Sequence, residues 1–449
     1  MIHTRLSQAA KWCGVQYLGQ DVSFHGVSLD SRATKPGELF IALKGLRHDG
    51  HDYIPQAQAN GAVAVMVSRR VDTALPLLPT NDAVFSLGKL ASAWRGNFIL
   101  PVTGVLGSNG KTTVKELIAH ILQTEAKSVL VTQGNQNNML GLPLTLLRLS
   151  PSHQAAVLEL GANKMNEIRV LAEIARPDIA VITNAGLDHM AGFGGREGAA
   201  LANSEVFSAM TNKGMAILNH DDACLPIWRR EIGSRTYLLF GFGPGAEVRG
   251  DWRQNKNGGQ LRIESPWGKL ETTLQLLGRH NALNAMAAAA ACMVMGVTLD
   301  TIATGLTQAR PISGRLKPYH GKGGASIIDD TYNANPSSLE TALQVLAAQP
   351  GQKILVFGDM AEIGLQAADS HRDVGVSARQ AGIDRLFTLG NMARHAARSF
   401  GVGAQSFDDY PTLIDALQPL LAPDVSVLIK GSRCMTMENI LSGICSSNT

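Results

Sequence analysis

Cysteine is scarce in this chain and gives no sign of a structural role. Its five cysteines are odd in number, and none stands in C-x-x-C spacing: Cys13, Cys224, Cys292, Cys434 and Cys445. A disulfide framework or a zinc site would need paired or closely spaced cysteines. We therefore expect free thiols in a reducing compartment.

Long apolar runs and a strong excess of one charge are also lacking. The most apolar window, residues 285–297, is shorter than the ~20 residues that a membrane-spanning helix needs. The first residues do not have the basic-then-apolar pattern of a signal peptide. The formal net charge is only +3, without a concentrated Lys/Arg tract, which disfavours nucleic acid as a partner. We therefore expect a cytoplasmic protein without a membrane or nucleic-acid partner.

The composition is instead that of a soluble globular protein. Hydrophobic residues make up 45% of the chain and charged residues 17%. A chain of 449 residues is too long for one ordinary core, so two to four domains are expected.

A glycine-rich turn is the most informative stretch. An apolar run over residues 98–106 predicts a buried strand, and residues 114–126 have apolar side chains at helical spacing. The intervening Gly107-Ser108-Asn109-Gly110-Lys111-Thr112-Thr113 has the context of a phosphate-binding loop. Lys111 is expected between the β- and γ-phosphates, and Thr112 on Mg²⁺. The first glycine of the generic pattern is displaced by one residue, so the alternative is a turn that only ends a strand.

Strands alternate with helices after this loop, which predicts a doubly wound parallel sheet. One predicted strand, residues 155–161, carries Glu159, and another, residues 178–183, leads to His189. Ligands of such sheets bind at the carboxyl ends of the strands, where both residues and the phosphate loop fall. Glu159 suits Mg²⁺, and His189 could hold a coordination place or orient a water. The alternatives are a solvated strand end and a hydrogen-bonded structural histidine.

The regions on either side have less specific patterns. Polar loops at residues 30–32 and 48–53 could equally be solvated turns. Asn281 and Asn284, in the first turn of a predicted helix, could cap that helix or read an adenine edge. The last part of the chain is Rossmann-like but has no G-x-G-x-x-G after its first strand, so nicotinamide binding is not expected. Its strands also end in polar residues, which implies a second half-site facing the first.

These patterns predict an α/β protein of three domains. The first is a small N-terminal α/β domain over residues 1–83. The second is a central P-loop domain with a doubly wound parallel sheet over residues 84–312. The third is a C-terminal Rossmann-like domain over residues 313–449.

Five motifs, in this order, together resemble the Mur ligase family: Gly107-Ser108-Asn109-Gly110-Lys111-Thr112-Thr113, Glu159-Leu160-Gly161-Ala162-Asn163, Thr183-Asn184-x-x-x-Asp188-His189, Gly278-x-His280-Asn281-x-x-Asn284-Ala285 and Gly314-Arg315-Leu316. Two more are similar to the family member that adds a dipeptide: Asp329-Asp330-x-Tyr332-Asn333-Ala334-Asn335-Pro336 and Lys430-Gly431-Ser432-Arg433. The resemblance covers nearly the whole chain.

The resemblance implies a reaction. ATP, with Mg²⁺, phosphorylates the terminal carboxylate of a UDP-N-acetylmuramoyl-tripeptide to an acyl phosphate. The amine of D-alanyl-D-alanine attacks, and the tetrahedral intermediate collapses with loss of phosphate, as in the synthesis of a peptidoglycan precursor. A monomer is expected, with domains that close on their substrates.

The resemblance also assigns roles to side chains. Lys111, Glu159 and His189 would be catalytic. ATP would contact Gly107, Ser108, Asn109, Gly110, Lys111, Thr112, Thr113, Asn281, Arg315 and Asp330. One metal would bind Thr112 and Glu159, and a second would bind His189. The UDP moiety would lie on the first domain, at Ser31, Arg32, Asp49 and His51. The sugar-peptide would face Asn135, Asn137 and Asn138, and the peptide ends would face Asn333, Asn335 and Ser432.

One position departs from the family. Mur ligases usually have a lysine in the run Ala-Lys-x-Glu-Ile/Val-Phe, carbamylated by CO₂, whose oxygens help to hold the second Mg²⁺. Here the run is Ala202-Asn203-Ser204-Glu205-Val206-Phe207. Asparagine cannot be carbamylated and is a weaker ligand for a hard cation. We therefore expect a weaker second metal site, or one completed by Glu205, His189 and water.

Three alternatives remain open at this point. The chain could be the Mur ligase that adds the third peptide residue, a folylpolyglutamate synthetase, or a P-loop regulatory NTPase. The last would not need so large a substrate domain, and the run at residues 332–336 favours the dipeptide-adding ligase. Whether peptide residue three is diaminopimelate or lysine also stays open.

Overall fold

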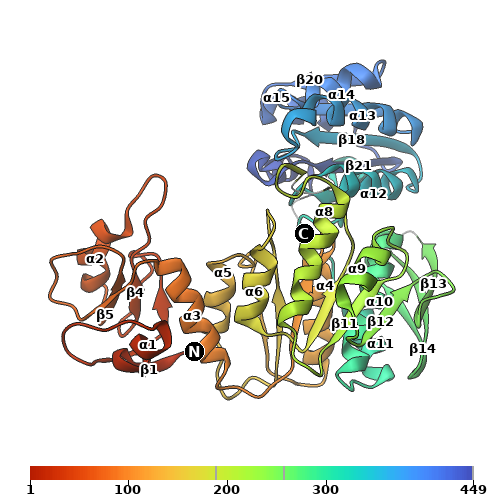
Figure 1. Ribbon diagram of the computed structural model, residues 1–449. Coiled ribbons are helices and arrows are strands. Elements are labelled where there is room, and N and C mark those ends of the chain that lie inside the picture. The colour runs from red at the N-terminus through yellow and green to blue at the C-terminus, as the bar shows by residue number, and fades with distance from the viewer. Residues whose placement is uncertain (188–189, 256–257, 447–449) are drawn as a thin grey trace.

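The computed structural model describes residues 1–187, 190–255 and 258–446. Three large sheets follow one another along the chain, and each is packed against helices (Figure 1). The C-terminal sheet lies over the central one, and the N-terminal domain extends from the far end of the central domain. This confirms the predicted α/β fold of three domains. None of the helices in the described parts of the chain combines the length and apolar character that a bilayer crossing requires.

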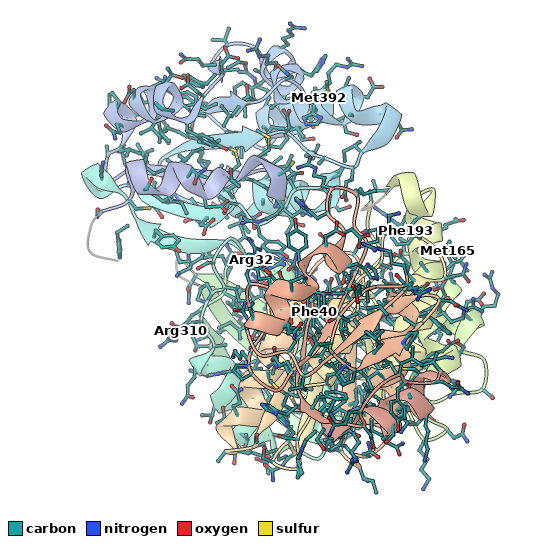
Figure 2. All side chains as sticks on the ribbon, turned by 90° about the vertical axis from the view of Figure 1, so that its left-hand side faces the viewer. Arg32, Phe40, Met165, Phe193, Arg310 and Met392 are labelled. Atoms are coloured by element: carbon teal, nitrogen blue, oxygen red, sulfur yellow. The ribbon has the colours of Figure 1, made fainter. Side chains whose placement is uncertain are left out.

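The N-terminal domain is built on a short parallel sheet of order β3-β4-β5-β6. Its elements are β1 (His3–Arg5), α1 (Leu6–Cys13), β2 (Ser23–His25), β3 (Val27–Ser28), β4 (Leu39–Ile41), α2 (Ile54–Ala59), β5 (Ala64–Val67) and β6 (Leu77–Pro79). Phe40 is buried in the core of this domain, whereas the side chain of Arg32 is exposed on it (Figure 2). Helix α3 (Ala83–Arg95) then packs against α1 on one side and, on the other, against α5 (Gly141–Leu146) of the central domain.

The central domain has a nine-stranded sheet of order β15-β14-β13-β12-β11-β10-β7-β9-β8. Its strands are β7 (Val102–Leu106), β8 (Val129–Val131), β9 (Ala155–Glu159), β10 (Ile179–Ile182), β11 (Met215–Asn219), β12 (Tyr237–Gly241), β13 (Val248–Asn255), β14 (Gly258–Ser265) and β15 (Gly268–Leu274). The helices are α4 (Lys111–Thr124), α5 (Gly141–Leu146), α6 (Glu167–Ala175), α7 (Met190–Phe193), α8 (Arg196–Ser204), α9 (Leu225–Ile232), α10 (Arg279–Val294) and α11 (Leu299–Gln308).

In the order of the sheet, the strands from β8 through β9, β7, β10, β11 and β12 to β13 pair in parallel, as predicted. Beyond β13 the pairing changes to antiparallel. Strands β13, β14 and β15 pair antiparallel to one another, which the sequence analysis did not anticipate. Strand β15 ends this addition at Leu274. Exposed and buried residues alternate along β15, as expected of an antiparallel strand with one face exposed to solvent.

The C-terminal domain has a six-stranded sheet of order β16-β17-β21-β18-β19-β20, in which only β16 runs antiparallel to its neighbour. Its strands are β16 (Lys317–His320), β17 (Ser326–Asp330), β18 (Gln352–Gly358), β19 (Arg385–Leu389), β20 (Ala404–Phe407) and β21 (Val425–Lys430). Its helices are α12 (Pro336–Ala347), α13 (Ala367–Gln380), α14 (Ala393–Phe400), α15 (Tyr410–Leu417) and α16 (Leu441–Ile444).

The predicted domain boundaries lie at the edges of these elements. The boundary after residue 83 falls at the first residue of α3, and the one after residue 312 falls between α11 and β16. We keep both as proposed boundaries. The first central strand begins at Val102, later than predicted, directly after a proline that cannot donate to a ladder.

The helix that follows the phosphate loop, α4, is held by α10 and α11. Gly305 of α11 lies directly on α4, because a Cβ added there would come within 2.9 Å of the Cα of Ile121. This close approach packs the second half of α4 directly against α11.

We expect Gly305→Ala to lower the free energy of unfolding by about 1–3 kcal/mol, because backbone rather than a mobile side chain blocks the added methyl group. Urea unfolding followed by circular dichroism measures the change. Gly45→Ala is the matched control, since the nearest atom to its Cβ is at an ordinary 3.4 Å. Equal stability of the two variants would contradict this account of the helix contact.

Candidate functional site

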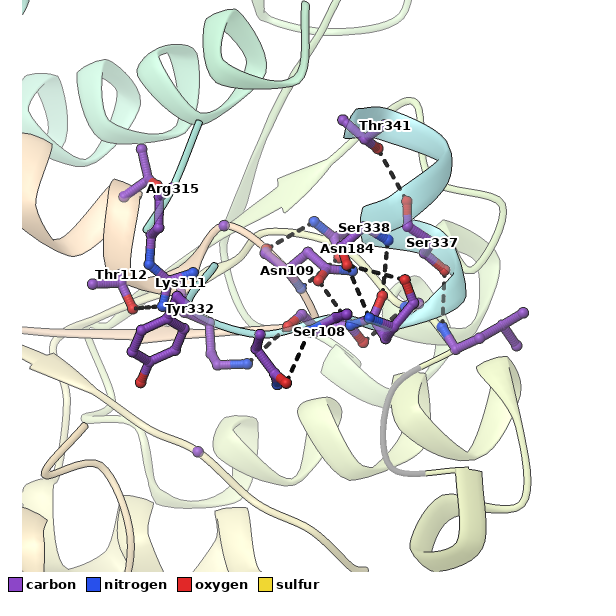
Figure 3. Close-up of a pocket in the computed structure, with 18 of the residues that line it drawn as sticks. Ser108, Asn109, Lys111, Thr112, Asn184, Arg315, Tyr332, Ser337, Ser338 and Thr341 are labelled. Atoms are coloured by element: carbon purple, nitrogen blue, oxygen red, sulfur yellow. Dashed lines mark hydrogen bonds between the residues drawn. The ribbon is translucent and has the colours of Figure 1, made fainter. Parts of the chain in front are cut away.

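A cleft of about 1050 Å³ lies between the central and C-terminal domains. Its walls come from the phosphate loop and from polar residues that follow strands of both sheets (Figure 3). The cleft therefore brings the phosphate loop together with C-terminal residues that lie more than 200 positions later in the sequence, from 113 to 314.

The phosphate loop joins β7 to α4 and is shaped by glycine. Gly107 and Gly110 have φ angles of 124° and 84°, where side chains are rarely tolerated. A Cβ on Gly107 would come within 2.2 Å of the Thr183 hydroxyl, so the loop can approach the end of β10 only without a side chain there. The backbone N–H of Asn109 donates to the Asn184 side chain at 3.0 Å. Helix α4 begins at Lys111, which places its N-terminus in the cleft.

Lys111 is folded back over its own loop. Its Nζ donates to the carbonyl oxygens of Gly107 at 2.5 Å and Ser108 at 2.9 Å. Carbonyl oxygens are the acceptors that an ammonium group takes when no phosphate oxygen is present. A bound polyphosphate would exchange these two contacts for contacts to its own oxygens.

Thr112 and Glu159 meet at the carboxyl ends of the central strands, as predicted. The Thr112 hydroxyl donates to Glu159 Oε2 at 2.9 Å, and the Asn137 amide donates to Glu159 Oε1 at 2.8 Å. Glu159 is only 3% exposed, so its carboxylate depends on these donors. Two hard oxygen ligands side by side fit one Mg²⁺ that keeps water and phosphate oxygens as its other ligands. Within the described residues, no group of three His, Cys, Asp or Glu side chains could hold a metal by itself.

The C-terminal domain reaches the phosphate loop through Arg315. Its guanidinium donates to the Thr112 hydroxyl at 2.8 Å and lies over the ring of Tyr332, 4.1 Å from the centroid. The backbone N–H of Gly314 donates to Asp329 at 2.8 Å, which fixes the segment that carries Arg315. Arg315 therefore lies at the phosphate loop, where the sequence analysis expected a nucleotide contact.

A second connection crosses the cleft at the start of α12. The Asn335 amide donates to the Asn109 side chain at 3.0 Å, and the Leu187 N–H donates to the Ser337 hydroxyl at 3.2 Å (Figure 3). Asn335 also caps α12, because its side-chain oxygen accepts the N–H of Ser338 at 2.8 Å. The predicted second half-site thus faces the first and touches it.

Asp330 forms a buried ion pair inside the C-terminal wall. Lys430 Nζ donates to Asp330 Oδ2 at 2.6 Å and to the Asn333 carbonyl at 2.9 Å. Burial raises the pKa of Asp330, and the ammonium of Lys430 opposes that rise. Asp330 lines the cleft, so this pair can accept hydrogen bonds from a ligand.

Asn281 and Asn284 line the cleft from the first turn of α10. The Asn281 amide donates back to the Leu277 carbonyl at 2.8 Å, and the Asn284 amide donates to Asn281 Oδ1 at 3.1 Å. The capping interpretation was wrong, because the N-cap of α10 is Gly278 and no side chain caps the helix. Contact with adenine stays a prediction.

The remaining predicted cleft residues are partly engaged by the backbone. Asn135, Asn138, Asn333 and Ser432 all line the cleft. Asn138 Oδ1 accepts the N–H groups of Leu140 and Gly141, and the Ser432 hydroxyl accepts the Ala361 N–H at 2.7 Å. Ser432 is only 2% exposed, so it shapes this wall more than it offers a free hydroxyl.

The predicted UDP-binding residues do not line this cleft; all four belong to the N-terminal domain, on which Figure 2 labels Arg32. The Ser31 hydroxyl donates to Gln56 at 2.7 Å, and Arg32 pairs with Asp30 at 2.7 Å, which holds the pKa of Asp30 at about 2.

His51 differs from its neighbours because it is buried. One ring nitrogen contacts Asp49 at 2.5 Å, and the other accepts the Ser68 N–H at 3.0 Å. The backbone N–H and the ring of His51 hold the pKa of Asp49 at about 2. A direct substrate contact from His51 would break these bonds, so its evident role is to hold the loop.

Two further predictions concern residues beyond the cleft walls. His189, predicted as a metal ligand, lies outside the described residues. Asn203 is 8% exposed and lines a small cavity with Gly107, Ser108 and Lys111. Glu205 does not line it; its two carboxylate oxygens accept the N–H groups of Asn166 and Arg169 at the start of α6. Completion of a second metal site by Glu205 stays a prediction.

The sequence analysis missed several groups that build the site. Lys115 lies behind Glu159, Asp222 accepts the Ala185 N–H at 2.8 Å, and Ser337 joins the two domains. Burial raises the pKa of Asp222. The clearest signal was Lys115, a charged residue within the otherwise buried face of the predicted helix.

Comparison with known proteins supports the same site. Three family models match: "Mur ligase family, catalytic domain" at residues 23–89, "Mur ligase middle domain" at residues 105–292, and "Mur ligase, glutamate ligase domain" at residues 314–433. Together they cover most of the chain, including the phosphate loop and the C-terminal wall of the cleft. The chain belongs to the Mur ligase family.

Within this family, similar curated proteins include several that are named UDP-N-acetylmuramoyl-tripeptide–D-alanyl-D-alanine ligase. The protein from Escherichia coli K12 is 40% identical over 100% of both chains, and that from Bacillus subtilis is 36% identical over 94% of this chain and 93% of its own. A crystal structure of MurF from Acinetobacter baumannii has a TM-score of 0.93 at 33% identity and 98% coverage of both chains. MurF from Thermotoga maritima in complex with ADP has a TM-score of 0.85 at 30% identity, covering 93% of this chain and 96% of its own.

His280 gives a test of the cleft's electrostatics. Burial, together with the nearby ammonium of Lys430, lowers the pKa of this cleft-lining histidine to about 4. The folded protein therefore holds the ring neutral, while the unfolded chain takes up a proton near pH ~6.5. This group should make stability fall as the pH drops from about 6.5 toward 4.

We expect the imidazole signals of His280 in NMR spectra to remain those of the neutral ring down to about pH 4. The exposed His3 provides the comparison within the same sample. A midpoint for His280 above pH ~6 would show that the ring is hydrated and the cleft more open than described.

Proposed function

We propose that this chain is an ATP-dependent amide-bond ligase that joins D-alanyl-D-alanine to UDP-N-acetylmuramoyl-tripeptide. One observation carries the proposal: the phosphate loop of the central domain and the polar strand ends of the C-terminal domain line one cleft, and Arg315 and Asn335 bridge it. A ligase needs this arrangement, because the nucleotide and the acceptor must meet on either side of the carboxylate. The names of the curated relatives agree with it.

The chemistry explains why these residue types are present. A carboxylate is a poor electrophile until one oxygen becomes a phosphate leaving group. Phosphoryl transfer is promoted mainly by positioning and by neutralising charge on the transferring group. Lys111, the N-terminus of α4 and Arg315 direct positive charge at this place, at the floor of the cleft. Arg315 comes from the other domain, so this set is complete only when the two domains approach each other.

Mg²⁺ belongs to this proposal as well. Thr112 and Glu159 would hold it, and when bound it would neutralise negative charge on the phosphates. Asn137 fixes the other oxygen of Glu159 and would keep the carboxylate turned toward the ion. ATP itself would lie along the phosphate loop, with Asn281 and Asn284 on its adenine side.

The substrates would divide between the domains. The exposed loops around Ser31, Arg32 and Asp49 would take the UDP moiety. Asn135, Asn137 and Asn138 would face the sugar-peptide, and the C-terminal wall around Asn333 and Asn335 would receive D-alanyl-D-alanine. A single chain supplies every part of this set, so we propose that the monomer is active.

The competing activities have weaker support. The ligase that adds 2,6-diaminopimelate and a folylpolyglutamate synthase have TM-scores of 0.58 and 0.63 against this chain. Their identities are 19% and 16%, which establish a shared fold and nothing about the substrate. The dipeptide-adding ligases match this chain at 40% identity for the Escherichia coli protein and at TM-scores of 0.93 and 0.85 for two solved structures, which favours their activity.

The proposal predicts which acceptor stimulates ATP turnover. In the presence of UDP-N-acetylmuramoyl-tripeptide and Mg²⁺, release of ADP should rise on addition of D-alanyl-D-alanine and should not rise with diaminopimelate or glutamate. A coupled assay of ADP measures this. Running it with both the diaminopimelate and the lysine tripeptide also determines the third residue. Stimulation by glutamate or by a diamino acid alone would contradict the proposal.

Asn203 makes a second prediction. It lies beside Lys111 at the position where the family usually has its carbamylated lysine. We propose an active ligase that does not respond to bicarbonate and needs more Mg²⁺ than lysine-bearing relatives.

Asn203→Lys should lower the Mg²⁺ concentration at half-maximal activity and make activity respond to added bicarbonate, because a carbamate would supply two anionic oxygens. Asn203→Gln, which cannot be carbamylated, is the control. If the unaltered enzyme loses activity when CO₂ is stripped and regains it with bicarbonate, another residue carries the carbamate and the proposal fails.

A further inference from the structure

Lys115 is a charged side chain in the interior of the protein. It belongs to α4, one turn after Lys111, and its exposed fraction is 0%. It does not line the cleft. A buried ammonium is costly unless partners surround it, so its partners indicate what it does.

Three oxygen atoms surround the ammonium of Lys115. The Thr132 carbonyl, just after β8, accepts its hydrogen bond at 2.8 Å. Glu116 Oε1 lies at 2.8 Å and Glu159 Oε2 at 3.9 Å. The carboxylate of Glu116 is about half exposed, so water solvates it even without Lys115. The carboxylate of Glu159 is buried and depends on protein partners.

Thr132 and Lys115 hold Glu159 at two points, its backbone and its carboxylate. The Thr132 hydroxyl accepts the backbone N–H of Glu159 at 3.0 Å, so it fixes the main chain at the end of β9. Lys115 faces Oε2, the same oxygen that accepts the Thr112 hydroxyl. Both supports of Glu159 therefore lie on the side away from the cleft.

The two side chains that donate to the Glu159 carboxylate, Thr112 and Asn137, both line the cleft, where ligands can reach them. A metal ion on the Thr112 hydroxyl would take a lone pair that accepts from Arg315 in this structure, while the hydroxyl proton can still be donated to Glu159. Asn137 would face the sugar-peptide under the proposed function. Lys115 does not line the cleft, so its charge stays beside Oε2, 3.9 Å away, while ligands contact Thr112 and Asn137.

We infer that Lys115 is a positioning residue for the nucleotide site: its buried charge holds Oε2 of Glu159 toward the metal position while ligands contact Thr112 and Asn137 in the cleft. The inference rests on the proposed use of Mg²⁺ with a nucleotide, and not on the identity of the acceptor. Its effect belongs to the metal-dependent part of nucleotide binding, because the phosphate loop binds the nucleotide through other groups.

Calorimetric titration with ADP separates the two parts. Each protein is titrated once in Mg²⁺ and once in EDTA, and the ratio of the two Kd values is the gain due to the metal. Lys115→Met should reduce that gain about tenfold or more, which is the usual effect of losing a partner behind a metal ligand. The Kd in EDTA should stay within about twofold of the unaltered protein, because the loop is intact. A merely structural loss would weaken both.

The matched control is Lys89→Met. Lys89 is exposed on α3, donates to the Cys13 carbonyl at 3.3 Å and lies far from the cleft walls. It should leave both Kd values unchanged. Lys115→Gln is the second variant, since its amide can still donate to Thr132 but carries no charge. Lys115→Gln should fold, and the gain in ADP affinity due to Mg²⁺ should still be reduced.

Glu159 itself provides the decisive comparison. Glu159→Gln should reduce the gain due to Mg²⁺, and adding Lys115→Gln should reduce it no further, because the two residues act through one carboxylate. An unchanged gain in Lys115→Gln, or additive losses in the double variant, would overturn the inference. The titration uses ADP and Mg²⁺ alone. Failure of the acceptor assay would therefore overturn the proposed ligase activity and leave the measured role of Lys115 in metal-dependent ADP binding unchanged.

Discussion

The hydroxyl of Thr112 is the point on which the rest of the site depends. It donates to Glu159 of the central sheet and accepts from Arg315 of the C-terminal domain. One small side chain thus joins the phosphate loop, the carboxylate behind it and the opposite domain. A hydroxyl can do this because it is both a donor and an acceptor. In the ligand-free protein these groups satisfy one another, and a metal-nucleotide complex would enter by replacing bonds that already exist.

The same exchange applies to the other groups at the floor of the cleft. Lys111 rests on the carbonyls of its loop, and Asn335 rests on Asn109. Each contact is polar, close to the cleft and easily replaced by a phosphate oxygen or a peptide group. Behind them lie contacts of a different kind, such as the Lys430–Asp330 pair and the Thr132–Glu159 bond, which are buried and stay in place. The contacts at the surface of the cleft can therefore be exchanged for ligand contacts, whereas the buried contacts behind them hold the shape of the site.

How much of this the sequence predicts depends on whether the signal is local. The phosphate loop and the strands around it follow from glycine spacing and apolar runs, and the structure has them. Arg315 and Asp330 were placed at the nucleotide only by family resemblance, because no local pattern shows which domains meet. Strands β13 to β15 were missed, since an antiparallel addition to a parallel sheet depends on pairing across the chain. Burial of His51 could not be predicted either, because it depends on Asp49 and Ser68 closing on both of its ring nitrogens.

The added strands of the central sheet also have a consequence for how the molecule behaves in a crowded solution. A nine-stranded sheet ends in an edge strand, β15, whose unpaired backbone groups could recruit a strand from another molecule. Helix α11 packs against this strand. On its other face, charged side chains pair across to the neighbouring strand, Lys269 with Glu264 and Glu271 with Arg262. Ionic side chains and a covering helix are the usual protection of an exposed edge, so the sheet resists self-association at the end where it was extended.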